Sequence, residues 1–292
     1  MSVKTYNFYK KRAYVVGDIH GHFDIIKNQI KTCKITNSVI IFAGDIGLGF
    51  EKPEYYKQIF PKLNRTMKTQ GNVLLFTRGN HDSKIYFENE LINYSNIKSI
   101  PDYSVVNIHQ DWDEEMKETP KFSILCVGGG VSIDRQHRLE VEEASVIEYK
   151  YWHPNASKED IEKHRKKYYW SDELPFYDVD KLDEITKEGY NIEYVVSHTA
   201  PDFCYPYTKK GIESWMRLDE NLEKDVDFER NTMTSIYNYL ISHKHILTGW
   251  YYGHFHSHYE SYYDNVKFTL LDCEHHKWDM VEIGYKPMEI NL

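Results

Sequence analysis

Short apolar runs alternate with amphipathic stretches over the first part of the chain. Three runs rich in β-branched or bulky apolar side chains are RAYVVG at 12–17, SVIIFAG at 38–44 and NVLLF at 72–76. Runs of this length and composition predict buried strands. Between them, Phe23, Ile26 and Ile30 recur at helical spacing within residues 22–33, and a second helix is expected from about residue 54 to residue 68. This alternation predicts parallel strands joined by crossover helices.

Strand-like patterns return in the rest of the chain. They occupy residues 103–109, 122–130, 191–198, 245–256, 259–264, 266–273 and 279–284. Helices are expected over 211–224 and 228–243. The pair Asp264 and Asn265 separates two of the strand-like runs, and such a pair favours a tight hairpin turn.

The stretch from about residue 134 to residue 190 differs from its surroundings. It is charged, rich in tyrosine and mostly helical in pattern. Within it, Ser157 is a plausible helix N-cap, because Asp160 follows three residues later. We interpret this stretch as a helical insertion or cap in a single domain that spans residues 1–292, and as a candidate oligomer interface.

Composition indicates a globular chain with a substantial core. The 292 residues are 41% hydrophobic and 15% aromatic, which argues against global disorder. No apolar stretch approaches the roughly 18 residues that a membrane span needs, and the first residues lack the apolar core of a signal peptide. The four cysteines, Cys33, Cys126, Cys204 and Cys273, form no CxxC pair. We therefore expect a cytoplasmic protein without a membrane partner, in which the cysteines are reduced and fill the core.

The formal net charge of −9 argues against extended nucleic acid as a partner, because a grip on phosphate backbones requires the opposite sign. Carboxylates that bind divalent cations also contribute to this negative figure, although the cations neutralise them.

Polar residues gather where the predicted strands end. The five segments are GDIHG at 17–21, GDIG at 44–47, RGNHD at 78–82, SH at 197–198 and GHFH at 253–256. In open α/β sheets, ligands bind at the carboxyl ends of the strands. The five segments are therefore expected to converge on one cleft.

These segments contain seven side chains that suit metal binding. They are Asp18, His20, Asp45, Asn80, His198, His254 and His256. Mixed nitrogen and oxygen donors suit Mn²⁺, Fe²⁺, Zn²⁺ or Ni²⁺, and the absence of a thiolate from the segments argues against a structural zinc site. Seven donors exceed the needs of one four-coordinate ion and suit two ions that share a carboxylate. Any one of these histidines alone is more typical of an ordinary polar turn than of a metal site; the full set in this order favours metal.

With these five motifs in this order, the sequence resembles the calcineurin-like metallophosphoesterases over most of its length. The resemblance implies an α/β fold, a four-layer αββα sandwich of two mixed β-sheets flanked by helices. It implies one metal ion on Asp18, His20, Asp45 and His256, and a second on Asp45, Asn80, His198 and His254. It also implies that His81 is the general acid and that Asp82 orients it.

The sequence departs from the family pattern in two places. The protein-phosphatase branch continues its second motif to aspartate-arginine-glycine, whereas this chain continues GDIGLGFEKP. The fourth motif is usually Gly-His, whereas this chain has Ser197 and His198. The segments GGGVSIDRQHR at 128–138 and YYWSDELP at 168–175 look like those of small bacterial and phage members of the family.

The expected chemistry is hydrolysis of a phosphoester. Two ions, with Mn²⁺ as first choice, would bind phosphate oxygens and turn a water that bridges them into an attacking hydroxide. His81 would protonate the leaving oxygen. Arg78 would bind two phosphate oxygens, unless it forms an ordinary ion pair, and Arg135 and Arg138 are candidates to line the substrate pocket.

The leading functional hypothesis is a metal-dependent phosphomonoesterase or phosphodiesterase acting on a small phosphorylated molecule, with a nucleotide favoured. The alternative within enzymes is a phosphoprotein phosphatase of the Ser/Thr type, which the missing aspartate-arginine-glycine disfavours. A nuclease is disfavoured by the net charge. A non-catalytic scaffold with the same fold should have lost donors, and every expected donor is present.

Overall fold

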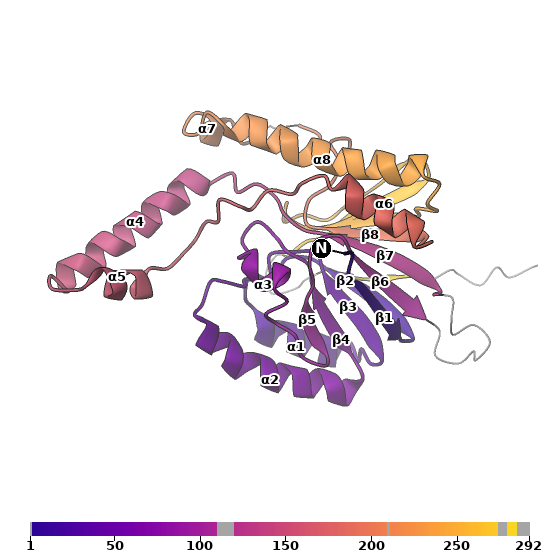
Figure 1. The fold of residues 1–292 in the computed structure, drawn as a ribbon, viewed down its shortest axis with the longest axis horizontal. Coiled ribbons are helices and arrows are strands. Elements are labelled where there is room, and N and C mark those ends of the chain that lie inside the picture. The colour runs from indigo at the N-terminus through magenta and orange to yellow at the C-terminus, as the bar shows by residue number, and fades with distance from the viewer. Residues whose placement is uncertain (1, 110–119, 209–210, 274–278, 285–292) are drawn as a thin grey trace, which may run out of the picture.

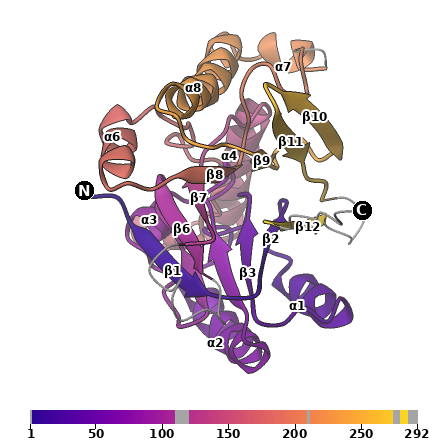
Figure 2. The same cartoon turned by 90° about the vertical axis from the view of Figure 1, so that its right-hand side faces the viewer.

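A computed structural model describes residues 2–109, 120–208, 211–273 and 279–284. Two mixed β-sheets stack against each other, and helices cover the outer face of each sheet (Figures 1 and 2). The four-layer sandwich expected from the family resemblance is therefore the observed fold.

The smaller sheet has five strands in the order β12-β2-β3-β4-β5. Their bounds are β2 Arg12–Val16, β3 Ser38–Phe42, β4 Val73–Phe76, β5 Ile97–Ser99 and β12 Met280–Ile283. Strands β2 to β5 are parallel, and β12 pairs antiparallel with β2. The parallel strands are joined through α1 (Phe23–Thr32), α2 (Pro53–Gln70) and the short α3 (Ile85–Glu88), as the alternation of patterns predicts.

The larger sheet has seven strands in the order β1-β6-β7-β8-β9-β11-β10. Their bounds are β1 Thr5–Tyr9, β6 Ser104–His109, β7 Phe122–Val127, β8 Ile192–Ser197, β9 Gly249–Tyr252, β10 Tyr259–Tyr263 and β11 Val266–Leu270. Strands β7, β8, β9 and β11 are parallel neighbours, so their carboxyl ends lie at one edge of the sheet. Helices α6 (Val179–Lys187) and α8 (Leu222–Ser242) cover the outer face, and α7 (Glu213–Met216) precedes α8 (Figure 2).

The packing of strand β3 on both faces explains why its sequence is apolar without interruption. Val39 and Ile41 belong to the apolar layer between the two sheets, whereas Ile40 and Phe42 belong to the layer under α1 and α2. Because successive side chains of a strand point to opposite faces, a strand covered on both faces buries every residue. All residues of β3 are buried accordingly.

The stretch from about 134 to 190 consists of two different parts. Helices α4 (Arg135–Trp152) and α5 (Lys158–His164) extend out from the sandwich (Figure 1). Helix α6 instead packs on the larger sheet through Leu182 and Ile185. Ser157 caps α5 in the predicted capping box with Asp160, and the helix ends at His164.

Other short-range expectations can be compared directly with the structure. Asp264 and Asn265 both have positive φ, at 48° and 64°, in the turn that joins antiparallel β10 and β11, which confirms the predicted hairpin. The sequence patterns missed strands β1 and β5 and overestimated the helix at 211–224, of which α7 and the start of α8 are helical. Within the described ranges, no helix is long and apolar enough to cross a membrane.

Candidate dinuclear metal centre

The five polar segments follow five strand ends, three from the smaller sheet and two from the larger one. Asp18, Asp45 and Asn80 follow β2, β3 and β4, whereas His198 follows β8 and the GHFH segment follows β9. The structure brings all seven predicted metal ligands into one region: Asp18, His20, Asp45, Asn80, His198, His254 and His256. The stacking of the two sheets therefore assembles the site.

His198 provides the clearest sign that this region binds a cation. Its Nδ1 lies 2.8 Å from the carbonyl oxygen of Ala43, which can only accept a hydrogen bond, so Nδ1 carries a proton. The other ring nitrogen, Nε2, then directs its lone pair at Asn80 Oδ1, 2.7 Å away, and at Asp45 Oδ1, 3.3 Å away. Three electron-rich atoms facing one another repel unless a positive charge joins them. A second neighbour that fixes the ring is typical of metal-binding histidines.

Asn80 is held so that its oxygen faces His198. The amide Nδ2 donates to Ser132 Oγ at 2.9 Å. Ser132 in turn contacts both oxygens of Glu173, through its backbone N–H at 2.9 Å and its hydroxyl at 2.5 Å. Because these contacts occupy the amide nitrogen, the amide oxygen remains the group presented to a metal.

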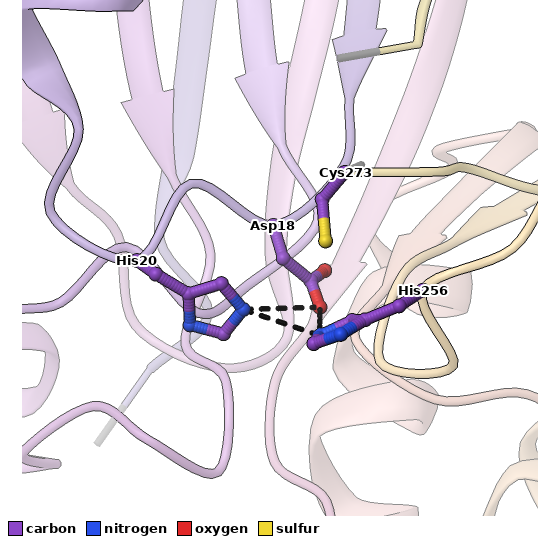
Figure 3. Close-up of side chains that lie close together, drawn as sticks. All are labelled: Asp18, His20, His256 and Cys273. Carbon is purple, nitrogen blue, oxygen red and sulfur yellow. Dashed lines mark hydrogen bonds and ion pairs between the residues drawn. The ribbon is translucent and has the colours of Figure 1, made fainter. Parts of the chain in front are cut away.

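A second group of donors surrounds Asp18 and is drawn in Figure 3. His256 Nε2 lies 3.2 Å from Asp18 Oδ2 and 3.2 Å from His20 Nε2. Asp18 is fully buried and also accepts the backbone N–H of His254. One ligand atom from each of Asp18, His20, His256 and Cys273 lies within 4.8 Å of the others. Asp18, Asp45 and His198 form another group whose ligand atoms lie equally close together. The donor chemistry thus fits two divalent cations.

Four of these ligands have a strained backbone. Positive φ angles occur at His20 (45°), Asp45 (48°), His254 (73°) and His256 (45°). Residues with a Cβ rarely adopt this conformation, which costs of the order of 1–3 kcal/mol each and persists where function requires it. The strain turns each side chain out of the line of its strand and toward the shared space.

Two glycines allow the carboxylates to approach the neighbouring backbone. A Cβ at Gly79 would overlap Asp45 Oδ1, and a Cβ at Gly253 would overlap Asp18 Oδ1. Any larger residue at either position would displace a predicted metal ligand. The RGNHD and GHFH segments thus contain glycine because a carboxylate approaches the backbone closely at each of these positions.

The centre places carboxylates and imidazoles, which can carry opposite charges, close together. Burial by itself would raise the pKa of Asp45, but the imidazoles of His198, His81 and His20 lower it well below its ordinary range. A hydrogen bond to Asp18 raises the pKa of His256 to about 11. The carboxylate of Asp45 is therefore ionised and ready to bind a cation.

Asp82 does not contact His81 in the expected way. Its two carboxylate oxygens accept the backbone N–H groups of Ile46, Gly47, Leu48 and Gly79 at 2.8–3.0 Å. The predicted orienting role is therefore not observed, because the whole carboxylate is engaged elsewhere. Asp82 instead fastens the loop after β3 to the loop after β4, and both loops carry metal ligands.

Arg78 is also not where the sequence analysis expected it. The side chain is fully buried. Its guanidinium donates to Asp102 Oδ2 at 2.9 Å and to the carbonyl of Glu173 at 2.9 Å. Arg78 does not line the cavity beside the metal ligands, so the predicted phosphate clamp is not observed; its ion pair with Asp102 is buried and is not the surface pair that was the alternative.

The two arginines proposed for the substrate pocket differ from each other. Arg135 pairs with Asp219 and Asp225, which connects the start of α4 to the start of α8, and it does not line the cavity. Arg138 lines the cavity and lies 3.2 Å from His81 Nε2. The structure therefore places only Arg138 within reach of a substrate.

His81 lies at the edge of the metal centre. Its Nε2 is 3.8 Å from Asp45 Oδ2 and accepts a hydrogen bond from Arg138 Nη2. Burial lowers the pKa of His81 to about 4, and the attraction of Asp45 offsets this only in part. His81 is therefore neutral in this arrangement, and Arg138 would have to release Nε2 before His81 could donate a proton from it.

Three residues near the centre were missed by the sequence analysis. Glu173 is buried and holds Ser132, as described above. Glu229, from α8, is buried beside Thr199 with its Oε2 3.9 Å from His254 Nε2. Cys273 was expected in the core, and so was Cys33, but Cys273 is partly exposed at the metal centre and Cys33 is exposed. Cys126 and Cys204 are buried, as expected.

A cavity of about 540 Å³ opens from the metal ligands toward α7 and α8. One wall carries Asp45, Asn80 and His254. Apolar and aromatic side chains also line the cavity, and Ile212, Trp215 and Phe255 are examples. The cavity therefore combines charged and apolar lining.

Two stacked mixed sheets, with nitrogen and oxygen donors from both at their strand ends, place the chain in the metallophosphoesterase class. The family model described as calcineurin-like phosphoesterase matches residues 11–257, and the chain belongs to this family.

Similar solved structures include a dimetal phosphatase from Danio rerio, at 11% identity and a TM-score of 0.45, covering 89% of this chain and 86% of that chain. GAP50 of Plasmodium, described as the anchor in the inner membrane complex, has 12% identity and a TM-score of 0.42, over 89% and 70%. Phosphopantetheinyl hydrolase from Mycobacterium tuberculosis has 12% identity and a TM-score of 0.37, over 89% and 88%. No curated protein sequence matches the chain.

Proposed function

We propose that this chain is a dinuclear metal-dependent phosphoesterase that hydrolyses a small phosphorylated molecule, with a nucleotide-like compound as the favoured class. The observation that carries the proposal is the lone pair of His198 Nε2, which faces Asn80 Oδ1 at 2.7 Å and Asp45 Oδ1 at 3.3 Å. A metal cation bound by all three atoms would satisfy this arrangement, and the other donors that converge beside it favour a metal over a proton on the ring.

The chain's own residues divide the remaining tasks. Two divalent cations, when bound, supply positive charge for the phosphate oxygens and acidify the attacking water. Asp18, His20, Asp45 and His256 would hold one ion, and Asp45, Asn80, His198 and His254 the other, with Mn²⁺ as first choice for the pair. His81 supplies the proton for the leaving oxygen once Arg138 has moved from its Nε2 to the substrate and Nε2 has taken up a proton from solvent.

The size of the cavity favours a small molecule as the substrate rather than a folded protein. Its volume of about 540 Å³ lies within the range of roughly 300–1,000 Å³ that small-molecule sites occupy. The charged lining suits the phosphate, and Arg138 can form paired hydrogen bonds to phosphate oxygens. Trp215 and Phe255 offer flat apolar surfaces for a base or another aromatic leaving group.

The test is a turnover assay on protein loaded with Mn²⁺. p-Nitrophenyl phosphate and its bis-ester distinguish monoesterase from diesterase activity, and a panel of nucleotides and phosphopeptides then defines the substrate class. We expect turnover on at least one ester and higher kcat/KM on nucleotides than on phosphopeptides. Faster hydrolysis of phosphopeptides would support a phosphoprotein phosphatase instead.

Two variants test whether turnover depends on the metal centre and not on the rest of the molecule. Asp45→Asn should lose bound metal and turnover together, because Asp45 contributes to both sites. His153→Ala, an exposed histidine at the end of α4, should change neither. A wild-type protein that binds two ions per chain and hydrolyses none of these substrates would overturn the proposed activity and favour a scaffold.

A further inference from the structure

Cys273 reaches the metal centre in the same way as the predicted ligands. It lies shortly after β11, and β11 is the parallel neighbour of β9, with Leu270 opposite Tyr252. The carboxyl ends of these two strands therefore lie side by side. β9 delivers His254 and His256 at this edge, and β11 delivers Cys273.

The side chain of Cys273 points into the donor group around Asp18 (Figure 3). One ligand atom from each of Asp18, His20, His256 and Cys273 lies within 4.8 Å of the other three. The sulfur interacts with both His20 and His256. Four atoms of this kind, gathered from three separate parts of the chain, have the spacing of ligands around one ion.

The two imidazoles of this group are placed where one cation would bind both. His20 Nε2 and His256 Nε2 face each other at 3.2 Å, beside the fully buried carboxylate of Asp18. A proton on one of the two nitrogens joins only this pair, whereas a single cation can bind both nitrogens, the carboxylate and the sulfur.

We propose that Cys273 is a ligand of the metal ion held by Asp18, His20 and His256, a role that rests on the metal binding in the proposed function. On binding, the sulfur loses its proton to solvent and ligates as the thiolate. The ion then has one sulfur, two nitrogen and at least one oxygen donor from the protein.

This donor set gives the two sites different metal preferences. Thiolates select soft or borderline ions such as Zn²⁺ and Fe²⁺, whereas carboxylate and amide oxygens also suit Mn²⁺. The site formed by Asp45, Asn80, His198 and His254 has only nitrogen and oxygen donors. With Cys273 as a ligand, the site beside it favours a thiophilic ion such as Zn²⁺, and Mn²⁺ remains the first choice for the neighbouring site only.

Cobalt is a direct reporter for this ligand, because Co²⁺ bound to a thiolate absorbs in the near ultraviolet by charge transfer, and Co²⁺ bound to nitrogen and oxygen alone does not. Metal-stripped protein is titrated with Co²⁺ and the bound cobalt is counted. Wild type should gain the band with one of its two equivalents, and Cys273→Ser should bind cobalt without the band. The control Cys33→Ser, an exposed cysteine after α1, should keep it.

A second measurement needs no variant. X-ray absorption of wild type loaded with one equivalent of Zn²⁺ should contain one sulfur neighbour at about 2.3 Å besides the nitrogen and oxygen neighbours at about 2.0–2.2 Å. In mixed Zn²⁺ and Mn²⁺, Cys273→Ser should lose at least about tenfold of the preference for Zn²⁺ at one site.

The outcomes separate this inference from the proposed function. Two bound ions with no charge-transfer band and no sulfur neighbour would refute the ligand role of Cys273 and leave a phosphoesterase intact. A band that survives in Cys273→Ser would also refute it. Wild-type protein that binds no divalent ion would instead overturn the proposed function itself.

Discussion

Asp82 Oδ1 accepts a 2.8 Å hydrogen bond from the backbone N–H of Gly47, so a carboxylate that follows β4 holds the loop that follows β3. The same carboxylate also binds its own loop through Gly79 at 2.9 Å. Since Asp45 lies in one of these loops and Asn80 in the other, Asp82 sets the distance between ligands of the second metal site.

Replacing Asp82 should therefore reduce stability and metal binding together. Asp82→Asn keeps one acceptor oxygen, so two of the four buried N–H groups lose their partner. We expect the free energy of unfolding to fall by about 2–6 kcal/mol, at about 1–3 kcal/mol for each unsatisfied group. Urea unfolding measures the loss, and Asp172→Asn, at an exposed position, is the matched control. Unchanged stability with reduced kcat would point back to an orienting role toward His81.

Arg78 should likewise behave as a structural residue. Breaking its buried pair with Asp102 leaves one charge without a partner, which costs about 3–5 kcal/mol. Arg78→Gln and Asp102→Asn should each lower the free energy of unfolding, and the double variant should lose less than the sum of the two. KM in variants that remain folded should be unchanged. A KM raised tenfold in Arg78→Gln without loss of stability would restore the phosphate-binding role.

The gathering of the candidate metal ligands was predictable because it follows from local patterns. Each predicted strand is a short apolar run, and Asp18, Asp45 and Asn80 come directly after such runs. A parallel arrangement then places their strand ends at a common edge. His198 and the GHFH segment follow the same rule in the other sheet, so sequence order and strand polarity were enough to anticipate the gathering of the donors.

The roles of Arg78 and Asp82 were not predictable because their partners are distant in sequence. The Asp102 carboxylate that binds Arg78 lies 24 residues away, and the Glu173 carbonyl lies 95 residues away. Local sequence indicates that Arg78 follows a strand, but not which way its side chain turns. Cys273 was missed for a similar reason: it belongs to no motif, and only the pairing of β11 with β9 places it at the site.

Glu173 provides a pH test of the support behind Asn80. Burial raises its pKa from an ordinary value of 4.5 to about 8, and the hydrogen bonds from Ser132 offset this only in part. In the metal-free protein, the folded state therefore holds a proton between about pH 4.5 and pH 8 that the unfolded state has released. Raising the pH through this window should lower the free energy of unfolding by up to about 1.4 kcal/mol per pH unit. The stabilising contribution of Glu173 to the free energy of unfolding is fully present below about pH 4.5.

Glu173→Gln should remove this contribution, because the amide cannot ionise and still offers one acceptor and one donor to Ser132. Urea unfolding of both metal-free proteins from pH 5 to pH 8 should yield a flatter profile for the variant. Glu188→Gln, at an exposed position after α6, is the control. Parallel profiles for wild type and Glu173→Gln would mean that Glu173 is ionised throughout.

The contact between Arg138 Nη2 and His81 Nε2 predicts two separable kinetic defects. His81→Ala should keep both metal ions and lose about 100-fold or more of kcat on alkyl phosphates, whose poor leaving group needs a proton. It should lose little on p-nitrophenyl phosphate, whose leaving group needs none. Arg138→Gln should instead raise KM for both substrates, because it removes a phosphate contact without removing the acid. If His81→Ala slowed both substrates equally, the acid role would be excluded, and His81 would act only on the geometry of the metal centre.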